Sequence, residues 1–403
     1  MNILFLSIVR FSNIDDRGIY MDLIRKFMSE NHSVYVVYPS ERRNKEKTGL
    51  TSAGHLKLLK VRTMNFQKTG FIEKGLATLM LERQFLHQIK RYFKDVHFDL
   101  VLYSTPPITF TKAVSYIKNR DNATTYLLLK DIFPQNAVDL GLFKKNGLLH
   151  KFFLKKEREL YEVSDFIGCM SPANVDFVIK QNPQIDEYKV EINPNSIEPL
   201  LALICEEERN LVRRQYGIPD EVAAFIYGGN LGKPQGVNFL IEVLISNKEN
   251  RSVFFVIVGD GTEYSAINKA VRLHQIGNVI LMKSLIKPEY DKLLQACDVG
   301  LIFLDRRFTV PNYPSRLLSY LEVRMPVLSA IDLSTDLGTI MERNKYGYWV
   351  ESGDFKAFNY YLDMLASDKD KCKVMGENGY QFLLENYLVE HSYNKIMSKF
   401  PNV

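Results

Sequence analysis

Short apolar runs alternate with amphipathic segments through the first half of the chain. Apolar runs predict strands at residues 3–9, 33–38, 100–103, 125–129 and 166–170. Between them, residues 19–29, 71–93 and 148–161 have the hydrophobic spacing of helices. Strands that are apolar on both faces and separated by helices are typical of a parallel sheet covered on both sides. This half is therefore predicted to have an α/β fold.

The same alternation pauses around residues 193–207 and then resumes. Five further strands are predicted at residues 222–227, 254–258, 279–281, 299–303 and 326–330. The pause contains the turn-rich stretch NPNSIEP, which favours a domain boundary near residues 195–210. We expect two doubly wound domains, residues 1–200 and 201–381, with ligands bound at the carboxyl ends of the strands. Residues 376–400 are predicted to be helical.

Composition narrows the class of protein. The chain has 403 residues, of which 46% are hydrophobic and 25% charged, as in a globular protein of two domains. No apolar run approaches the roughly 18 residues of a membrane-spanning helix. The opening MNILFLSIV lacks a basic region and a cleavage site, so it is interpreted as a strand and not a signal peptide. The four cysteines and seven histidines have no metal-ligand spacing, so we expect a reduced, cytoplasmic protein without a metal or other cofactor.

Charge is divided unevenly along the chain. The net formal charge is +5, but residues 1–156 carry 26 Lys and Arg against 13 Asp and Glu, a balance of +13. Residues 157–403 carry 26 against 34, a balance of −8. The excess of positive charge in residues 1–156 therefore indicates that this part of the chain meets an anionic partner or surface.

Three loops of the second half follow predicted strands. The first is YGGNLGKPQG at 227–236, the second is VGDGTE at 258–263 and the third is VPNYPSRL at 310–317. Glycine allows close approach of backbone to a ligand, and Lys233 and Arg316 can bind phosphate. Ser315 near a predicted helix start exposes backbone N–H groups that favour an anion. The alternative for each loop is a turn that serves packing only. None matches the dinucleotide-binding or Walker pattern.

These motifs resemble a known family. GGNLGKPQG, VGDGTEY, PNYPSRLLSYLEVRMPVLSA and GYWVESGD, in this order, are similar to the nucleotide-sugar-binding domain of glycosyltransferase family 4, especially bacterial O-antigen and capsule transferases. In the first half, DLVLYSTPPITF, LLLKDIFPQNAVDLGL and MSPANVDFVIKQNP resemble the acceptor domain. The resemblance implies the GT-B fold, with two Rossmann-like domains facing each other across a cleft. It also implies a C-terminal helix at about 382–403 that crosses back to the first domain, and sugar transfer with retention.

The chain departs from the family at several positions. Asn230 and Gln235 stand where relatives have Arg and Lys. Ser319 and Pro311 replace the paired glutamates, so no acid at those positions can meet the donor sugar. The His–acid pair of many relatives reads Lys130-Asp131.

The resemblance assigns roles to two groups of residues. Activating an acceptor hydroxyl requires a base, for which Asp131 is the first candidate, with Lys130 beside it; Asp16 and Asp15 are alternatives. A turn or cap ahead of Pro134 is the other interpretation of Asp131. The candidate acceptor-binding residues are Asp15, Arg17, Gly18, Thr105, Pro106 and Asn195. The candidate donor-binding residues are Gly229, Asn230, Lys233, Gly259, Asp260, Gly261, Lys283, Tyr313, Pro314, Ser315, Arg316, Leu317 and Ser319.

Residues 142–156 interleave lysines with large apolar side chains. Apolar groups that enter a bilayer interface while lysines meet anionic headgroups are typical of a peripheral membrane contact. The predicted contact residues are Phe143, Lys144, Lys145, Lys151, Phe152, Phe153, Lys155 and Lys156. The alternative is an amphipathic helix that packs on its own domain. Nucleic acid is not expected, because the basic segments lack any nucleic-acid-binding signature.

The leading hypothesis is a glycosyltransferase at the cytoplasmic face of the plasma membrane. It would use a nucleotide diphosphate sugar to extend a polyprenyl-diphosphate-linked saccharide in surface polysaccharide biosynthesis, alongside other polysaccharide-assembly enzymes. The alternatives are a non-hydrolysing sugar-nucleotide 2-epimerase and a catalytically silent sugar-nucleotide-binding subunit. The basic, aromatic segment argues against the epimerase, and the absent glutamates suggest the silent subunit.

Overall fold

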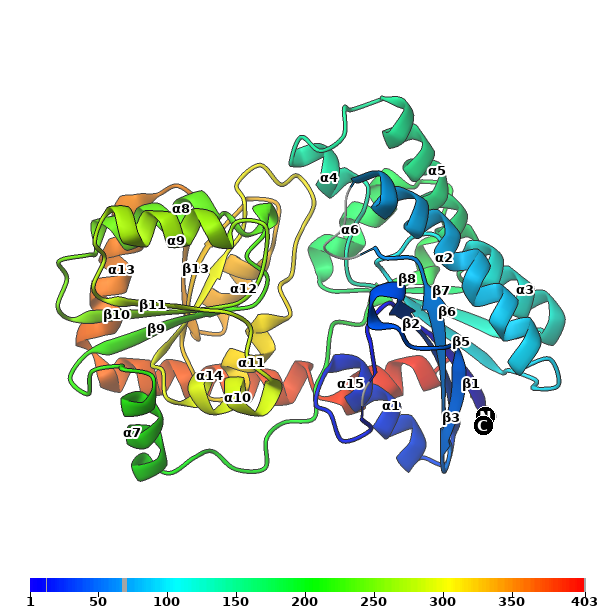
Figure 1. Ribbon diagram of the computed structural model, residues 1–403, viewed down its shortest axis with the longest axis horizontal. Coiled ribbons are helices and arrows are strands. Elements are labelled where there is room, and N and C mark those ends of the chain that lie inside the picture. Colours follow the sequence, from blue (N-terminus) through cyan, green and yellow to red (C-terminus); the bar gives the residue numbers. More distant parts are fainter. Residues whose placement is uncertain (12, 67–70, 402–403) are drawn as a thin grey trace. The chain divides into compact units, whose positions relative to one another are not determined.

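The computed structural model describes residues 1–11, 13–66 and 71–401. The chain forms two compact units, coloured along the sequence in Figure 1. The first unit consists of Met1–Ile197 together with Val389–Val403, and the second of Glu198–Leu388.

The first unit contains an eight-stranded sheet in the order β3-β4-β2-β1-β5-β6-β7-β8. All neighbouring strands are parallel except β3, which pairs antiparallel with β4. The polar, exposed β3 was not predicted, because it has no apolar face to bury. The strands are β1 Asn2–Leu6, β2 Ser33–Glu41, β3 Gly49–Ala53, β4 Leu56–Thr63, β5 Leu100–Ser104, β6 Thr124–Leu129, β7 Phe166–Cys169 and β8 Val190–Ile192.

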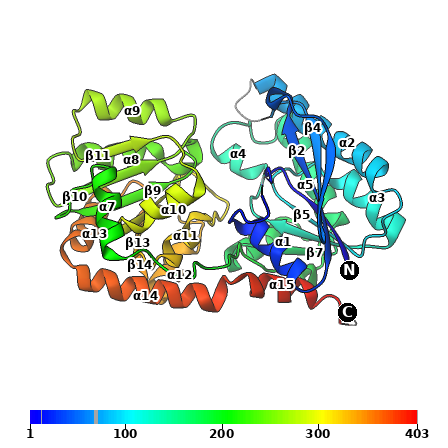
Figure 2. The same ribbon diagram turned by 60° about the horizontal axis from the view of Figure 1, so that its bottom comes forward.

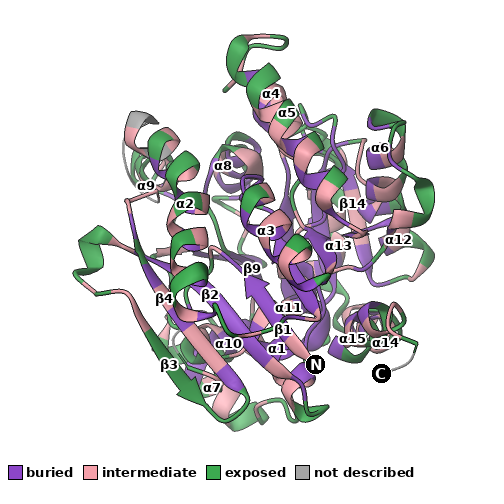
Figure 3. Ribbon diagram, turned by 90° about the vertical axis from the view of Figure 1, so that its right-hand side faces the viewer, coloured by how far each residue is buried: buried purple, intermediate pink, exposed green. Residues whose placement is uncertain are grey.

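Helices cover both faces of this sheet. On one face α1 packs against α15, and their apolar side chains share a core with Phe5, Val36 and Leu102 of the strands. α3 contacts both α2 and α5. Figure 3 shows the buried strands beneath half-exposed helices. The helices are α1 Ile19–Ser29, α2 Phe71–Tyr92, α3 Thr111–Asp121, α4 Gln135–Asp139, α5 Leu148–Val163, α6 Pro172–Gln181 and α15 Val389–Met397.

The second unit contains a six-stranded, fully parallel sheet in the order β11-β10-β9-β12-β13-β14. This order reverses direction between β9 and β12, which is the switch point where doubly wound sheets bind ligands. The predicted α/β fold with two Rossmann-like domains is confirmed. The strands are β9 Ala223–Gly228, β10 Val253–Val258, β11 Val279–Met282, β12 Val299–Phe303, β13 Val327–Ile331 and β14 Gly347–Glu351.

Helices of the second unit bury the sheet from both sides. α8 packs beside α9, and Phe239 of α8 and Phe358 of α13 meet Phe303 of β12 in one core. α11 packs against α14 (Figure 2). The helices are α7 Glu206–Gln215, α8 Val237–Ser246, α9 Tyr264–Leu273, α10 Lys287–Gln295, α11 Arg316–Glu322, α12 Leu337–Arg343, α13 Phe355–Ser367 and α14 Lys369–Asn386.

The C-terminal segment is two helices where one was expected at about 382–403. α14 ends at Asn386 and packs in the second unit, and α15 starts at Val389 and packs in the first. The two helices are therefore separated at Tyr387, whose side chain is buried in the second unit with its hydroxyl 2.5 Å from the hydroxyl of Tyr313.

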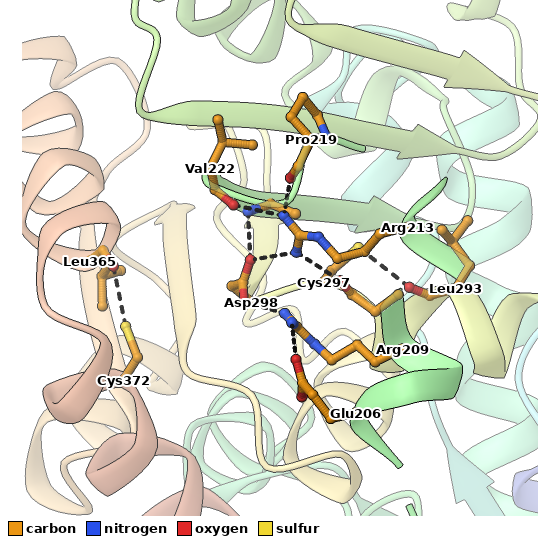
Figure 4. Close-up of polar contacts among 12 residues, drawn as sticks. Glu206, Arg209, Arg213, Pro219, Val222, Leu293, Cys297, Asp298, Leu365 and Cys372 are labelled. Atoms are coloured by element: carbon orange, nitrogen blue, oxygen red, sulfur yellow. Dashed lines mark hydrogen bonds and ion pairs between the residues drawn. The ribbon is translucent and has the colours of Figure 1, made fainter. Parts of the chain in front are cut away.

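A buried arginine connects α7 to the sheet of the second unit. Arg213 is fully buried and donates to the carbonyl oxygens of Pro219, Val222 and Ala296 at 2.6, 2.7 and 3.1 Å (Figure 4). Its guanidinium also pairs with Asp298 at 3.1 Å. The Asp298 carboxylate in turn accepts a hydrogen bond from the backbone N–H of Ala224 at the start of β9. This network fixes one end of the two central strands.

Candidate functional site

The loop after β9 leads from the sheet into α8 and is held by its own side chains. Gly228, the last residue of β9, packs directly against the side chain of Tyr290. A Cβ atom at position 228 would lie 1.9 Å from the Tyr290 hydroxyl. The Tyr227 hydroxyl donates to the carbonyl oxygen of Asn230 at 2.7 Å. Asn230 and Lys233 are exposed, and the Lys233 ammonium has no ion-pair partner among the described residues. Lys233 is therefore free to meet a ligand, and no side chain in the described part of the chain fixes its ammonium group.

The loop after β10 lies directly against the first loop. A Cβ at Gly259 would meet the carbonyl oxygen of Gly229 at 1.8 Å, and one at Gly261 would meet that of Leu231 at 2.2 Å. The Leu231 N–H donates to the Asp260 carbonyl oxygen at 2.9 Å. Gly259 and Gly261 therefore allow two backbone segments to touch. This is a packing role, the alternative to ligand binding that the sequence leaves open for this loop.

Asp260 and Lys283 lie beside these glycines as a pair. Lys283 Nζ is 3.0 Å from the Asp260 carboxylate and 3.5 Å from the centroid of the Tyr264 ring. Both predicted residues are thus brought together at the carboxyl ends of β10 and β11. Each has a protein partner in this arrangement.

Arg316 is a cation held by two side chains at the switch point of the second unit. Its guanidinium carbon lies 4.2 Å from the centroid of the Tyr227 ring, and Nη2 donates to Gln235 Oε1 at 2.5 Å. Nη1 is buried and has no hydrogen-bond partner among the described residues. The backbone at Gly229 passes beside it, since a Cβ there would be 3.6 Å from the guanidinium. The arrangement leaves one oriented N–H₂ group available to an anion.

The other predicted residues of the third loop differ in exposure. The Tyr313 hydroxyl bonds to that of Tyr387 in the core, and the Leu317 N–H donates to the Pro314 carbonyl oxygen at 3.2 Å. Ser315 is exposed. Ser319, one turn further along α11, is half-buried. Tyr313 and Leu317 are therefore buried residues that anchor the loop in the core of the second unit.

In the first unit, Thr105 connects the ends of β5 and β6. Its buried hydroxyl accepts hydrogen bonds from the backbone N–H groups of Lys130 and Asp131 at 2.9 and 3.1 Å. Lys130 Nζ donates to the Asn193 carbonyl oxygen at 3.2 Å. Desolvation lowers the pKa of Lys130 from its ordinary value to about 7. The ammonium therefore titrates near neutrality, and a nearby anion would raise its pKa.

Asp131 has a different environment from the residue before it. The side chain is open to solvent but lies in the wall of an apolar cavity. Desolvation by the surrounding protein raises its pKa to about 6. Among the described residues the carboxylate has no hydrogen-bond or ion-pair partner. An accessible, unpaired carboxylate with a raised pKa has the properties of a general base.

The cavity beside Asp131 was not predicted from the sequence. It has a volume of about 730 Å³ and lies between α2, α4, α5 and the loops that follow β5 and β6. Pro106, a predicted acceptor-site residue, forms part of its wall. Small-molecule sites commonly have volumes of about 300–1,000 Å³ and mostly apolar linings.

The remaining acceptor-site candidates lie in two places. In the loop before α1, the Asp16 carboxylate accepts from the backbone N–H of Asn13 at 3.0 Å, so it stabilises a turn. Asp15 is exposed there, while Arg17 and Gly18 are half-buried. After β8, Asn195 is buried, and its Oδ1 has no hydrogen-bond partner among the described residues.

The predicted membrane segment has two kinds of surface. Lys144, Lys145, Lys151 and Lys155 are exposed, as is Phe152. The half-buried rings of Phe143 and Phe153 stack at 5.5 Å and line the cavity. Lys156 is also half-buried and pairs with Glu159 at 2.7 Å. Phe143, Phe153 and Lys156 are therefore turned partly into the unit.

Residues 1–11, 13–66 and 71–401 contain neither a metal-binding cluster nor a membrane-spanning helix. No group of three or more His, Cys, Asp or Glu side chains there is placed to hold a metal ion. No helix in these ranges combines the length and the apolar character needed to cross a bilayer.

Known proteins provide independent comparisons. Residues 208–382 match the family model of Glycosyl transferases group 1. The chain is 22% identical over 311 residues to WbjE of Pseudomonas aeruginosa, named as a glycosyltransferase, a match that covers 74% of this chain and 73% of WbjE. It is 22% identical over 247 residues, 60% of each chain, to WcaI of Escherichia coli strain K12, named as a colanic acid biosynthesis glycosyl transferase.

A solved structure supports the fold over the full length. Alr3699/HepE of Anabaena, crystallised in complex with UDP and glucose, superposes with a TM-score of 0.71 at 14% identity and with full coverage of both chains. Together these matches show a glycosyltransferase with the GT-B fold. They do not favour the epimerase or the silent subunit, because the family model and both relatives carry the name of a glycosyltransferase.

Proposed function

We propose that this glycosyltransferase is a retaining, family 4 enzyme that moves a sugar from a nucleotide diphosphate sugar to a hydroxyl of a lipid-linked saccharide. It would act at the cytoplasmic face of an anionic membrane during the assembly of a surface polysaccharide. Support comes from the resemblance of the motifs, from the name of WcaI and from the UDP and glucose bound to HepE.

The buried, unpaired Nη1 of Arg316 is the observation that carries the donor assignment. Cleavage of the bond between the anomeric carbon and the diphosphate leaves negative charge on the departing oxygen, and a fixed cation stabilises that charge. Arg316 is held in place by protein groups alone, Tyr227 and Gln235. The exposed Lys233 would add a second, mobile cation.

On the acceptor side, Asp131 would take the proton from the attacking hydroxyl. The new bond joins the acceptor oxygen to the anomeric carbon on the same face from which the diphosphate departs with the bonding electron pair, so that the configuration is retained. The raised pKa of Asp131 places it closer to the working pH than an ordinary carboxylate, which favours proton transfer. Lys130, which is held by Asn193, would contribute positive charge nearby when an anion is bound.

The membrane assignment rests on α5 and the segment before it. Leu148 is 89% exposed and Leu149 54%, next to the exposed lysines. Apolar side chains of this kind insert at a bilayer interface, and each nearby lysine contributes about 1 kcal/mol on an anionic leaflet.

The donor assignment is tested by isothermal titration with UDP, GDP, ADP and dTDP against their monophosphates. We expect one nucleoside diphosphate to bind about tenfold or more tightly than its monophosphate, and Arg316→Gln to abolish that difference. Arg324→Gln is the matched control, because Arg324 lies beyond the end of α11 and pairs with Glu377 at 3.2 Å. Equal affinity of wild type and Arg316→Gln for the diphosphate would exclude the assigned role.

The membrane assignment is tested by flotation on anionic vesicles. Replacing Lys144, Lys145 and Lys151 with Gln should strongly reduce flotation, and added salt should weaken binding of the wild type. The control replaces three exposed lysines elsewhere on the unit, Lys45, Lys47 and Lys180, and changes the net charge equally. The assignment is wrong if the two triple variants float alike.

A further inference from the structure

The apolar cavity of the first unit is built from segments far apart in sequence. α2 contributes Gly75 and Leu79 to one wall, and α5 contributes Phe152 and Phe153 to another. Phe133, from the loop after β6, packs edge-on against Phe153 with ring centroids 5.1 Å apart. A lining of aliphatic and aromatic groups favours a ligand that is itself a hydrocarbon.

The cavity has a polar end. Asp131, in the loop after β6, and Asn136, in the first turn of α4, lie close together in the sequence. With Thr78 they supply the only polar side chains of the lining within the described residues. The Asn136 Oδ1 is buried without a hydrogen-bond partner there. A ligand that fills the cavity would therefore meet hydrogen-bonding groups where the sheet ends, and apolar groups along the helices.

An apolar part of the cavity lining also reaches the surface. Leu79, Leu142 and Leu149 line the cavity and are also exposed. Next to them, Lys144 and Lys151 are exposed, with no ion-pair partner in the described part of the chain. An apolar opening beside free cations is complementary to an anionic lipid.

We infer that this cavity binds the hydrocarbon chain of the acceptor, in the part next to its diphosphate, so that the enzyme recognises the lipid as well as the saccharide. This inference rests on the proposed function. The exposed leucines receive the chain from the bilayer, whose anionic headgroups meet the exposed lysines, and the diphosphate and the hydroxyl-bearing saccharide lie beyond the polar end of the cavity, beside Asp131.

Gly75 allows the cavity to be filled without disturbing its walls. A Cβ at Gly75 would have no described atom within 4 Å, and the residue lies within α2. Gly75→Leu places an isobutyl group in the space, while Gly75→Ala leaves most of it open. Both substitutions raise helix propensity, so both variants should fold.

Binding is measured by titrating the full chain with farnesyl diphosphate and, separately, with inorganic diphosphate and dodecanoate. We expect farnesyl diphosphate to bind saturably and more tightly than either control. Gly75→Leu should weaken it roughly tenfold, as expected from the loss of about two buried methylenes, and Gly75→Ala should not. Equal affinity of wild type and Gly75→Leu would overturn the inference, as would dodecanoate binding as tightly as farnesyl diphosphate.

A second measurement separates this inference from the proposed function. The KM for a long-chain and for a short-chain acceptor is compared in wild type and in Gly75→Leu. A rise of KM for the long-chain acceptor alone supports the inference. Transfer with unchanged KM for both acceptors overturns the cavity assignment and leaves the transferase function in place, whereas nucleotide binding without transfer to any lipid-linked saccharide overturns the proposed function itself.

Discussion

Asp131 combines three properties that seldom occur in one surface carboxylate. It is open to solvent, it has no partner among the described residues, and its pKa is raised to about 6 by the protein around it. Its backbone N–H is fixed by the Thr105 hydroxyl, so the side chain starts from a defined position. The same hydroxyl also holds Lys130, whose side chain reaches Asn193.

Replacing Asp131 with Asn should remove the proposed base and keep the shape of the site. We expect sugar transfer to fall by about 100-fold or more, with the affinity for the donor unchanged. Asp16→Asn is the matched control, since Asn can also accept the hydrogen bond from Asn13. Steady-state kinetics and donor titration measure both effects. If Asp16→Asn abolishes transfer and Asp131→Asn does not, the base has been assigned to the wrong residue.

The pH dependence follows from the same pKa. The wild-type rate should fall about tenfold per pH unit below pH 6, because the protonated carboxyl cannot accept a proton. The folded pKa exceeds the ordinary value of 3.8, so ionisation of Asp131 disfavours folding as the pH rises from about 4 to 6. Asp131→Asn should therefore be at least as stable as wild type above pH 6, and that difference should vanish below pH 4. Thermal melts at several pH values test this.

At the scale of elements, the loops after β9 and β10 pack directly against each other. Gly259 and Gly261 allow the second loop to touch the backbone of the first, which carries Gly229 past Arg316. The proposed donor site thus depends on a backbone contact as well as on charged side chains.

Gly261→Ala should disturb this contact. Its Cβ would lie 2.2 Å from the Leu231 carbonyl oxygen, so the loops must separate, at a cost of about 1–3 kcal/mol. We expect a lower melting temperature and weaker nucleotide binding. Gly277→Ala, where a Cβ has no described atom within 4 Å, is the control and should change neither. If Gly261→Ala changes neither the melting temperature nor nucleotide binding, the loops do not need this contact.

The buried Arg213 of α7 provides a second test at this scale. Arg213→Ala leaves three carbonyl oxygens without this donor and removes one of the two arginines that pair with Asp298, which should cost about 3–5 kcal/mol of folding free energy. Arg214→Ala, at the exposed neighbouring position, should cost less than about 0.5 kcal/mol. Urea denaturation measures both, and similar values for the two variants would contradict the structural role.

Strands buried on both faces could be predicted from the sequence because every position in them is apolar, as in β10 Val253–Val258. The β3 strand could not, because its residues are polar and its pairing depends on the neighbouring strand. Arg316 was identified as a candidate cation, but its support by Tyr227 and Gln235 requires residues about 80 to 90 positions away in the chain. The cavity was not predicted for a related reason: hydrophobic spacing shows which faces of α2 and α5 are apolar, but not that they leave a space between them.

At the scale of the whole molecule, the last helix belongs to the first unit. Tyr393 of α15 stacks edge-on against Phe27 of α1 at 5.2 Å, and Lys26 pairs with Glu390 at 2.6 Å. Ile396 is fully buried in the same core.

A chain that stops at Leu388 should lose protection of α1. Removal of α15 uncovers Phe27 and its neighbours, so hydrogen exchange in α1 should accelerate and proteolysis of the first unit should increase. A chain that stops at Phe400 retains α15 and is the control. Unchanged exchange in α1 of the shorter chain would contradict the stabilising role of this helix.

The return of α15 also has a consequence for synthesis on the ribosome. The first unit emerges early, yet its final helix is translated only after the whole second unit. At about 5–20 residues per second, translation of the second unit alone delays the covering of α1 by roughly 10–40 s. During that interval the nascent chain presents an unfinished hydrophobic surface, which makes it a substrate for chaperones until translation ends.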